Sequence, residues 1–127
     1  MFPDWVHGCQ MVQIALWMWA GISKIGPWFS EVLPFLVKES LWSLLLPEGA
    51  LGKALYRGLP TECGPSRLAR VLAAFGVVLE FMLPALLFAP STVLNQIGCY
   101  GMMSYHLVII SCVPFASVFE WNYYCVF

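Results

Sequence analysis

Three long apolar runs constrain the fold of this chain more than any other feature of its sequence. They cover residues 5–23, 68–88 and 93–115. A helix of about 20 residues, rising about 1.5 Å per residue, crosses the hydrocarbon core of a bilayer. Of the whole chain 61% is hydrophobic and 10% is charged, whereas a soluble domain averages about 25% charged residues. We therefore predict an all-α integral membrane protein with three transmembrane helices in one domain, residues 1–127.

The connection between the first two runs, residues 24–67, contains a fourth apolar stretch over residues 31–46. Lys38 and Glu39 interrupt that stretch, which favours an interfacial or re-entrant helix over a complete span. The second and third runs are joined by "APST", residues 89–92. A connection this short predicts that the two helices form an antiparallel hairpin.

The six cations predict how the protein is oriented in the membrane. All of them lie between residues 24 and 70, at Lys24, Lys38, Lys53, Arg57, Arg67 and Arg70. Loops rich in lysine and arginine stay in the cytoplasm. We expect residues 24–67 in the cytoplasm, the N-terminus outside, and the plasma (inner) membrane as the location.

The remaining composition limits the partners. The net charge of −1 gives no electrostatic reason to expect nucleic acid. The five cysteines are odd in number and lack C-x-x-C spacing, so we predict no metal site and leave the cofactor unknown. The chain stops at "FEWNYYCVF", where another apolar segment begins. We therefore expect a fragment of a larger protein, with the bilayer and further transmembrane helices of the same or another chain as partners.

Three polar residues lie at similar depth in the predicted spans: Gln13, Glu80 and His106. Counted by helix rise, Glu80 and His106 are each about 3 Å from the centre of their spans. Polar groups inside a membrane normally face protein and pair with one another. Because the second and third helices are hairpin neighbours, we predict that Glu80 pairs with His106. Lys24 is expected to extend toward the head groups.

The sequence leaves three functions open for these residues. Gln13, Glu80 and His106 would bind a lipid-like or small hydrophobic ligand. Alternatively, Glu80 and His106 would be the catalytic acid and base of a membrane enzyme. In the third alternative, a structural or assembly subunit, they would form hydrogen bonds that lock helices together, each worth about 0.6 kcal/mol.

The start of the second span carries signals of its own. Ser66 can cap the helix by accepting a backbone hydrogen bond. Arg67 and Arg70 would anchor the helix at the inner head groups, or hold an anionic lipid. Ala69, Ala73 and Gly76 share the helix face of Glu80 and predict close contact with a neighbouring helix.

Three motifs occur in order along the chain: "WAGISKIGPWF" (19–29), "YRGLPTECGPSRLARVLAAFGVVLEFMLP" (56–84) and "SYHLVIISCVPFASVFEWNYYCVF" (104–127). Together they resemble an uncharacterised family of polytopic transmembrane proteins found notably in actinobacteria. That family is distantly similar to the HTTM-type membrane domain of vitamin K-dependent carboxylase. The resemblance implies a longer protein with more membrane helices, and it assigns no role to any residue.

Overall fold

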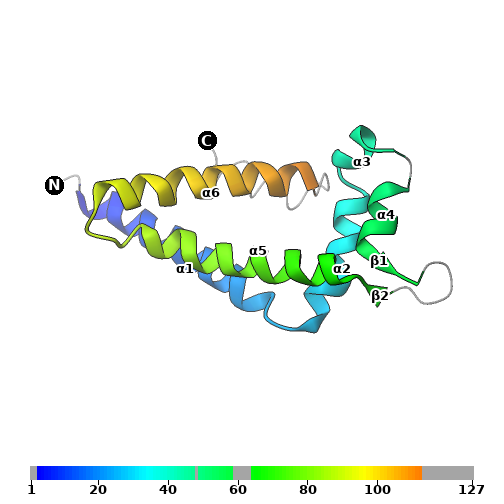
Figure 1. Ribbon diagram of the computed structural model, residues 1–127. Coiled ribbons are helices and arrows are strands. Elements are labelled where there is room, and N and C mark those ends of the chain that lie inside the picture. The colour runs from blue at the N-terminus through cyan, green and yellow to red at the C-terminus, as the bar shows by residue number, and fades with distance from the viewer. Residues whose placement is uncertain (1–2, 48, 59–63, 113–127) are drawn as a thin grey trace.

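The computed structural model describes residues 3–47, 49–58 and 64–112, and most of them are helical (Figure 1). The three long helices are α1 (Pro3–Ser23), α5 (Arg67–Leu86) and α6 (Thr92–Cys112). Between α1 and α5 lie α2 (Pro27–Lys38), α3 (Trp42–Leu45), α4 (Ala50–Leu55) and an antiparallel pair of two-residue strands, β1 (Tyr56–Arg57) and β2 (Gly64–Pro65). The prediction of an all-α protein is confirmed.

Helix α5 is the central element, and it packs against α1, α2 and α6. Its buried residues recur every three or four positions, which places them on one face: Ala69, Ala73, Gly76, Glu80 and Pro84. The other faces are apolar but exposed, with Val71, Phe75, Val78 and Met82 among them. Among the described residues, α5 is the one helix long and apolar enough to cross a membrane. Three transmembrane helices remain a prediction.

Helices α5 and α6 form the predicted antiparallel hairpin (Figure 1). Two glycines of α6 allow the close approach. A Cβ atom on Gly98 would lie 3.1 Å from the carbonyl oxygen of Leu83, and a Cβ atom on Gly101 would lie 2.6 Å from Cδ2 of Leu83. Larger side chains would therefore push the two helices apart.

Helix α1 packs along α5 but ends beside the middle of α5. A Cβ atom on Gly21 would lie 3.0 Å from the ring of Phe81, fourteen residues after the start of α5 at Arg67. The chain then breaks, because Gly26 takes a φ of 143° that side chains disfavour. Pro27 is the first residue of α2, a position that suits its fixed φ. Helix α2 leaves this break in a new direction (Figure 1).

The single helix predicted over residues 31–46 is wrong in its bounds. Two helices occupy this stretch, α2 from Pro27 to Lys38 and the four-residue α3. Buried Ser40 separates them, since its backbone N–H and its hydroxyl both donate to the carbonyl oxygen of Val37, at 3.2 and 2.5 Å. A hydroxyl that bonds to the preceding turn competes with continuation of the helix. The last residues of the predicted third span, 113–115, lie outside the described residues.

Ser66 fixes the start of α5, as predicted. Its hydroxyl oxygen accepts a hydrogen bond from the N–H of Ala69 at 3.1 Å, and its hydroxyl donates to the carbonyl oxygen of Ala54 at 2.7 Å. Its N–H also donates to the carbonyl oxygen of Leu55 at 2.8 Å. One serine thereby caps α5 and ties the end of α4 to it.

Candidate functional site: a buried polar cluster and an adjoining hollow

Glu80 is buried in the middle of the molecule, with 3% of its surface exposed. Its Oε1 accepts a hydrogen bond from Nζ of Lys24, and the two side chains form an ion pair. Lys24 is the first residue after α1, and its side chain keeps 24% of its surface exposed. The structure therefore joins the end of α1 to the middle of α5 through opposite charges.

This ion pair gives Glu80 a partner that was not predicted, and it corrects the predicted position of Lys24. We predicted that Glu80 pairs with His106 and that the side chain of Lys24 extends toward the head groups. Because α1 ends beside the middle of α5, the ammonium group of Lys24 instead lies level with the carboxylate. A buried charge needs a partner of opposite sign, and an ammonium group supplies a full positive charge.

Tyr105 of α6 approaches the same carboxylate. Its hydroxyl donates a hydrogen bond to the carbonyl oxygen of Gly76 at 3.4 Å, one turn before Glu80 on α5. The phenol group also interacts electrostatically with Glu80. Each of the three long helices thus contributes to the surroundings of Glu80, since Lys24 directly follows α1.

His106 lies in the same three-helix core, with 4% of its surface exposed. Its ring stacks edge-on against Trp17 of α1, with centroids 4.4 Å apart and an interplanar angle of 77°. Trp17 also contacts Tyr105, at 5.9 Å between ring centroids. We call these five residues the polar cluster: Trp17, Lys24, Glu80, Tyr105 and His106.

The polar cluster contains two of the three predicted ligand-binding residues, Glu80 and His106. Contacts through Tyr105 and Trp17 connect them. Gln13 is half-buried on α1, one turn before Trp17. Sequence reasoning missed Trp17 and Tyr105, although both positions carried a signal. An aromatic residue directly before His106, and another one helical turn after Gln13, would lie near the predicted polar residues.

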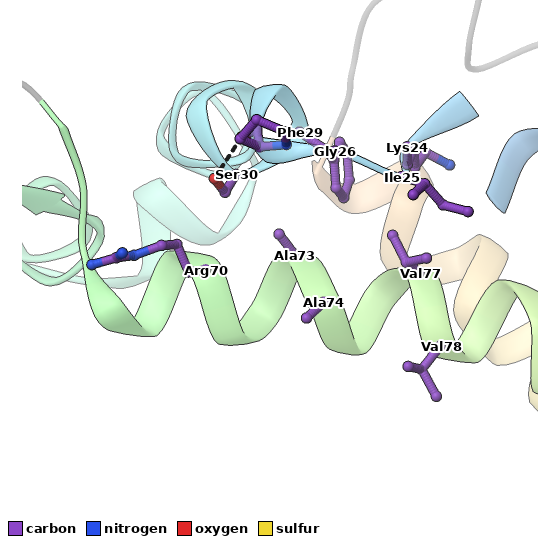
Figure 2. Close-up of a pocket in the computed structure, with 11 residues that line it drawn as sticks. Lys24, Ile25, Gly26, Phe29, Ser30, Arg70, Ala73, Ala74, Val77 and Val78 are labelled. Atoms are coloured by element: carbon purple, nitrogen blue, oxygen red, sulfur yellow. Dashed lines mark hydrogen bonds between the residues drawn. The ribbon is translucent and has the colours of Figure 1, made fainter. Parts of the chain in front are cut away.

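A hollow of about 430 Å³ adjoins the cluster, between α5 and the break that follows α1 (Figure 2). Its wall on α5 is made of small and apolar side chains: Ala73, Ala74, Val77 and Val78. The opposite wall comes from residues 24–27, Phe29 and Ser30. Two cations line the hollow, Lys24 and Arg70, and Figure 2 shows them toward opposite ends of it.

The two cations differ in their surroundings. Lys24 is neutralised by Glu80, and its Nζ lies 5.7 Å from the ring centroid of Phe29. Arg70 is exposed and forms no ion pair within the described part of the chain. Arg67, the other predicted head-group residue, is also exposed but does not line the hollow. An apolar wall with an unpaired guanidinium group at one end suits a ligand that is apolar along its length and anionic at its head.

Comparison with known proteins places the chain in a family. A search of curated proteins and a search of solved structures each found no match. A family model described as "Transmembrane protein of unknown function (DUF3556)" matches residues 1–127. The chain is therefore a membrane protein and belongs to this family of transmembrane proteins.

Proposed function

We propose that this chain is a membrane domain that binds an anionic, lipid-like molecule in the hollow between α5 and the α1–α2 break. The observation that carries the proposal is the lining of the hollow, which combines apolar walls with the guanidinium group of Arg70. In this proposal α5 and α6 cross the plasma membrane, and α1 enters it from the outside and ends level with Glu80. After the α1–α2 break the chain returns to the cytoplasmic face, so that α3, α4 and the start of α5 lie on the cytoplasmic side.

The position of Arg70 supports an anionic head group. Arg70 lies in the first turn of α5, ten residues before Glu80, which corresponds to about 15 Å along the helix. With the N-terminus of α5 at the cytoplasmic face, this arginine is level with the head groups of the inner leaflet. That leaflet carries the anionic lipids that attract lysine and arginine.

The walls support an acyl chain. Ala73 and Ala74 lie one turn beyond Arg70 and leave room beside α5, and Val77 continues the apolar surface. An extended hydrocarbon chain along this path would pack against the part of α5 that α1 does not reach. The acyl chain would then end near Lys24, whose charge is already paired with Glu80.

Glu80 enters this proposal through Lys24 and needs no contact with the ligand. Its burial and its ion pair support a role in holding the rim of the hollow in place. We propose that His106 and Gln13 stabilise the same three-helix core. The acid–base alternative for Glu80 and His106, and the distant resemblance to HTTM-type domains, remain predictions.

A second candidate is the structural subunit, favoured by the burial of Glu80 and His106 among three helices. In that case the polar cluster only fixes how the helices pack. The hollow would then hold any bulk lipid without regard to charge. The two candidates differ in whether Arg70 selects an anionic lipid.

Native mass spectrometry of the full-length protein, released from micelles containing phosphatidylglycerol and phosphatidylcholine, distinguishes them. We expect bound phosphatidylglycerol in preference to phosphatidylcholine. Arg70→Ala should lower that preference about fivefold, because one cation near anionic lipid contributes about 1 kcal/mol. Arg67→Ala is the matched control, since it removes the same charge from the same turn of α5 outside the hollow. Equal losses in both variants, or no loss in either, would contradict the proposed site.

A further inference from the structure

The segment from Leu41 to Leu46 forms an exposed apolar surface on the cytoplasmic side of the proposed topology. Five of its six residues are large and hydrophobic, and all five are exposed: Leu41, Trp42, Leu44, Leu45 and Leu46. We call these five residues the leucine ledge. Leu44 and Leu45, in the short helix α3, have 80% and 75% of their surfaces exposed. An exposed apolar patch of this kind marks a contact with protein or membrane.

Two hydrogen bonds fix the ledge to the end of α6. The N–H of Leu41 donates to the carbonyl oxygen of Ser111 at 3.0 Å. Nε1 of Trp42 donates to the hydroxyl oxygen of Ser111 at 2.8 Å. Ser111 is in the last turn of α6, which ends at Cys112. The ledge therefore lies at one defined end of the helix hairpin.

The chemistry of the ledge fits the boundary between head groups and acyl chains. No charged residue occurs between Ser40 and Leu46. The nearest charged residues along the described chain are Glu39 and Lys38 before the ledge and Lys53 after it, on α4; all three are exposed. Leucine and tryptophan beside lysine are the composition of segments that lie in the membrane interface, where the cations contact anionic head groups.

We propose that the leucine ledge inserts into the cytoplasmic leaflet, at the depth where head groups meet acyl chains. This inference rests on the proposed membrane placement of α5 and α6. The ledge is bonded to Ser111, one turn after Leu107 and Val108 of α6, which are also exposed and apolar. Its bonds to Ser111 then hold the cytoplasmic segment, and with it the rim of the hollow, against the membrane surface.

Electron paramagnetic resonance of single spin labels tests this insertion. Labels are placed at Leu44→Cys or Leu45→Cys in the full-length protein with its native cysteines replaced by serine. The protein is reconstituted in vesicles of phosphatidylcholine and phosphatidylglycerol. Collisions with oxygen, which concentrates in lipid, are compared with collisions with a water-soluble nickel chelate. We expect the oxygen collisions to exceed the nickel collisions at both ledge positions.

Two exposed positions provide the references. Phe75→Cys on α5, which is exposed and does not line the hollow, should report lipid, and Lys53→Cys on α4 should report water. If Phe75 reports lipid while the ledge positions collide mainly with nickel, the insertion is overturned and the membrane placement stands. Low collision rates with both reagents at the ledge would mean that protein covers it, which also overturns the insertion. If Phe75 itself reports water, the membrane placement fails and the insertion fails with it.

Discussion

At the scale of single residues, the described part of the chain contains two lysine–glutamate pairs in opposite environments. Lys24 and Glu80 join two helices, with 24% and 4% of their side-chain surfaces exposed. Lys38 and Glu39 are neighbours in sequence, with Nζ and Oε1 3.9 Å apart and side chains 59% and 47% exposed. Water screens the second pair, whereas protein surrounds the carboxylate of the first. The same two residue types therefore have different effects on stability.

Replacing one member of the buried pair should destabilise the fold strongly. Lys24→Met leaves a buried carboxylate without its counter-charge, and Glu80→Met leaves an ammonium group facing an apolar core. We expect each to lower the free energy of unfolding by about 3 kcal/mol. The double variant should lose less than either single change, because neither charge remains. Reversible unfolding in mixed micelles measures all three values.

Lys38→Met and Glu39→Met are the controls for this cycle. An exposed pair contributes about 1 kcal/mol or less, so each control should unfold at nearly the wild-type free energy. Losses at Lys24 and Glu80 as small as those of the controls would show that the cluster does not stabilise the bundle.

The sequence identified the unusual residue but not its ion-pair partner. Glu80 stands alone in an apolar run, so a buried polar contact could be predicted from sequence alone. Its partner depends on the position of α1 along α5, and no local sequence pattern encodes that position. His106 was the nearest candidate by chain topology, and Lys24 became the partner because α1 ends level with Glu80. The helix cap at Ser66 and the small-residue face of α5 were predictable, since both depend on spacing within one element.

At the scale of elements, helix contacts depend on where glycine allows close approach. Gly98 of α6 faces the carbonyl oxygen of Leu83 and the Cβ atom of Leu86, and a Cβ on Gly98 would lie within 3.1 Å of both. One is a backbone atom and the other is a Cβ atom, so neither can move without shifting α5. By contrast, a Cβ on Gly52 of α4 would have no atom within 4 Å.

Gly98→Ala should therefore separate α5 and α6 and lower the free energy of unfolding by about 1–3 kcal/mol, as overpacking does. Gly52→Ala is the matched control, and its effect should be neutral or stabilising by up to about 1 kcal/mol, because alanine favours helix over glycine. Thermal unfolding followed by circular dichroism compares the two. A midpoint for Gly98→Ala at or above the wild-type value would argue against tight packing at this crossing.

The break between α1 and α2 shows the same limit of sequence reasoning. Gly26 and Pro27 predict that a helix ends there, and it does. Their position in the sequence does not predict that the break lies beside the middle of α5. That stagger opens the hollow next to Ala73 and Ala74. The hollow could not be predicted, because it depends on the relative placement of two elements.

At the scale of the whole molecule, the long connection and the helices form one packed unit. Helix α4 is tied to α5 through Ser66, and the ledge is tied to α6 through Ser111. These contacts carry the cationic segment to a single end of the α5–α6 hairpin. The proposed orientation puts that end in the cytoplasm.

Labelling with a membrane-impermeant maleimide tests this orientation. Lys53→Cys, in a background without native cysteines, is exposed on α4. It should react in permeabilised cells and stay unlabelled in intact cells. A cysteine added before Met1 provides the reverse control and should react in intact cells. Labelling of Lys53→Cys in intact cells would mean that the protein is inverted.

The ion pair between Lys24 and Glu80 also has a consequence for biosynthesis. The two residues are 56 positions apart. The ribosome therefore synthesises α1 and Lys24 well before it synthesises Glu80. In the proposed topology Lys24 lies level with Glu80 inside the membrane, where a lysine opposes insertion by about 3 kcal/mol. We therefore expect α1 to reach its final depth only after α5 arrives.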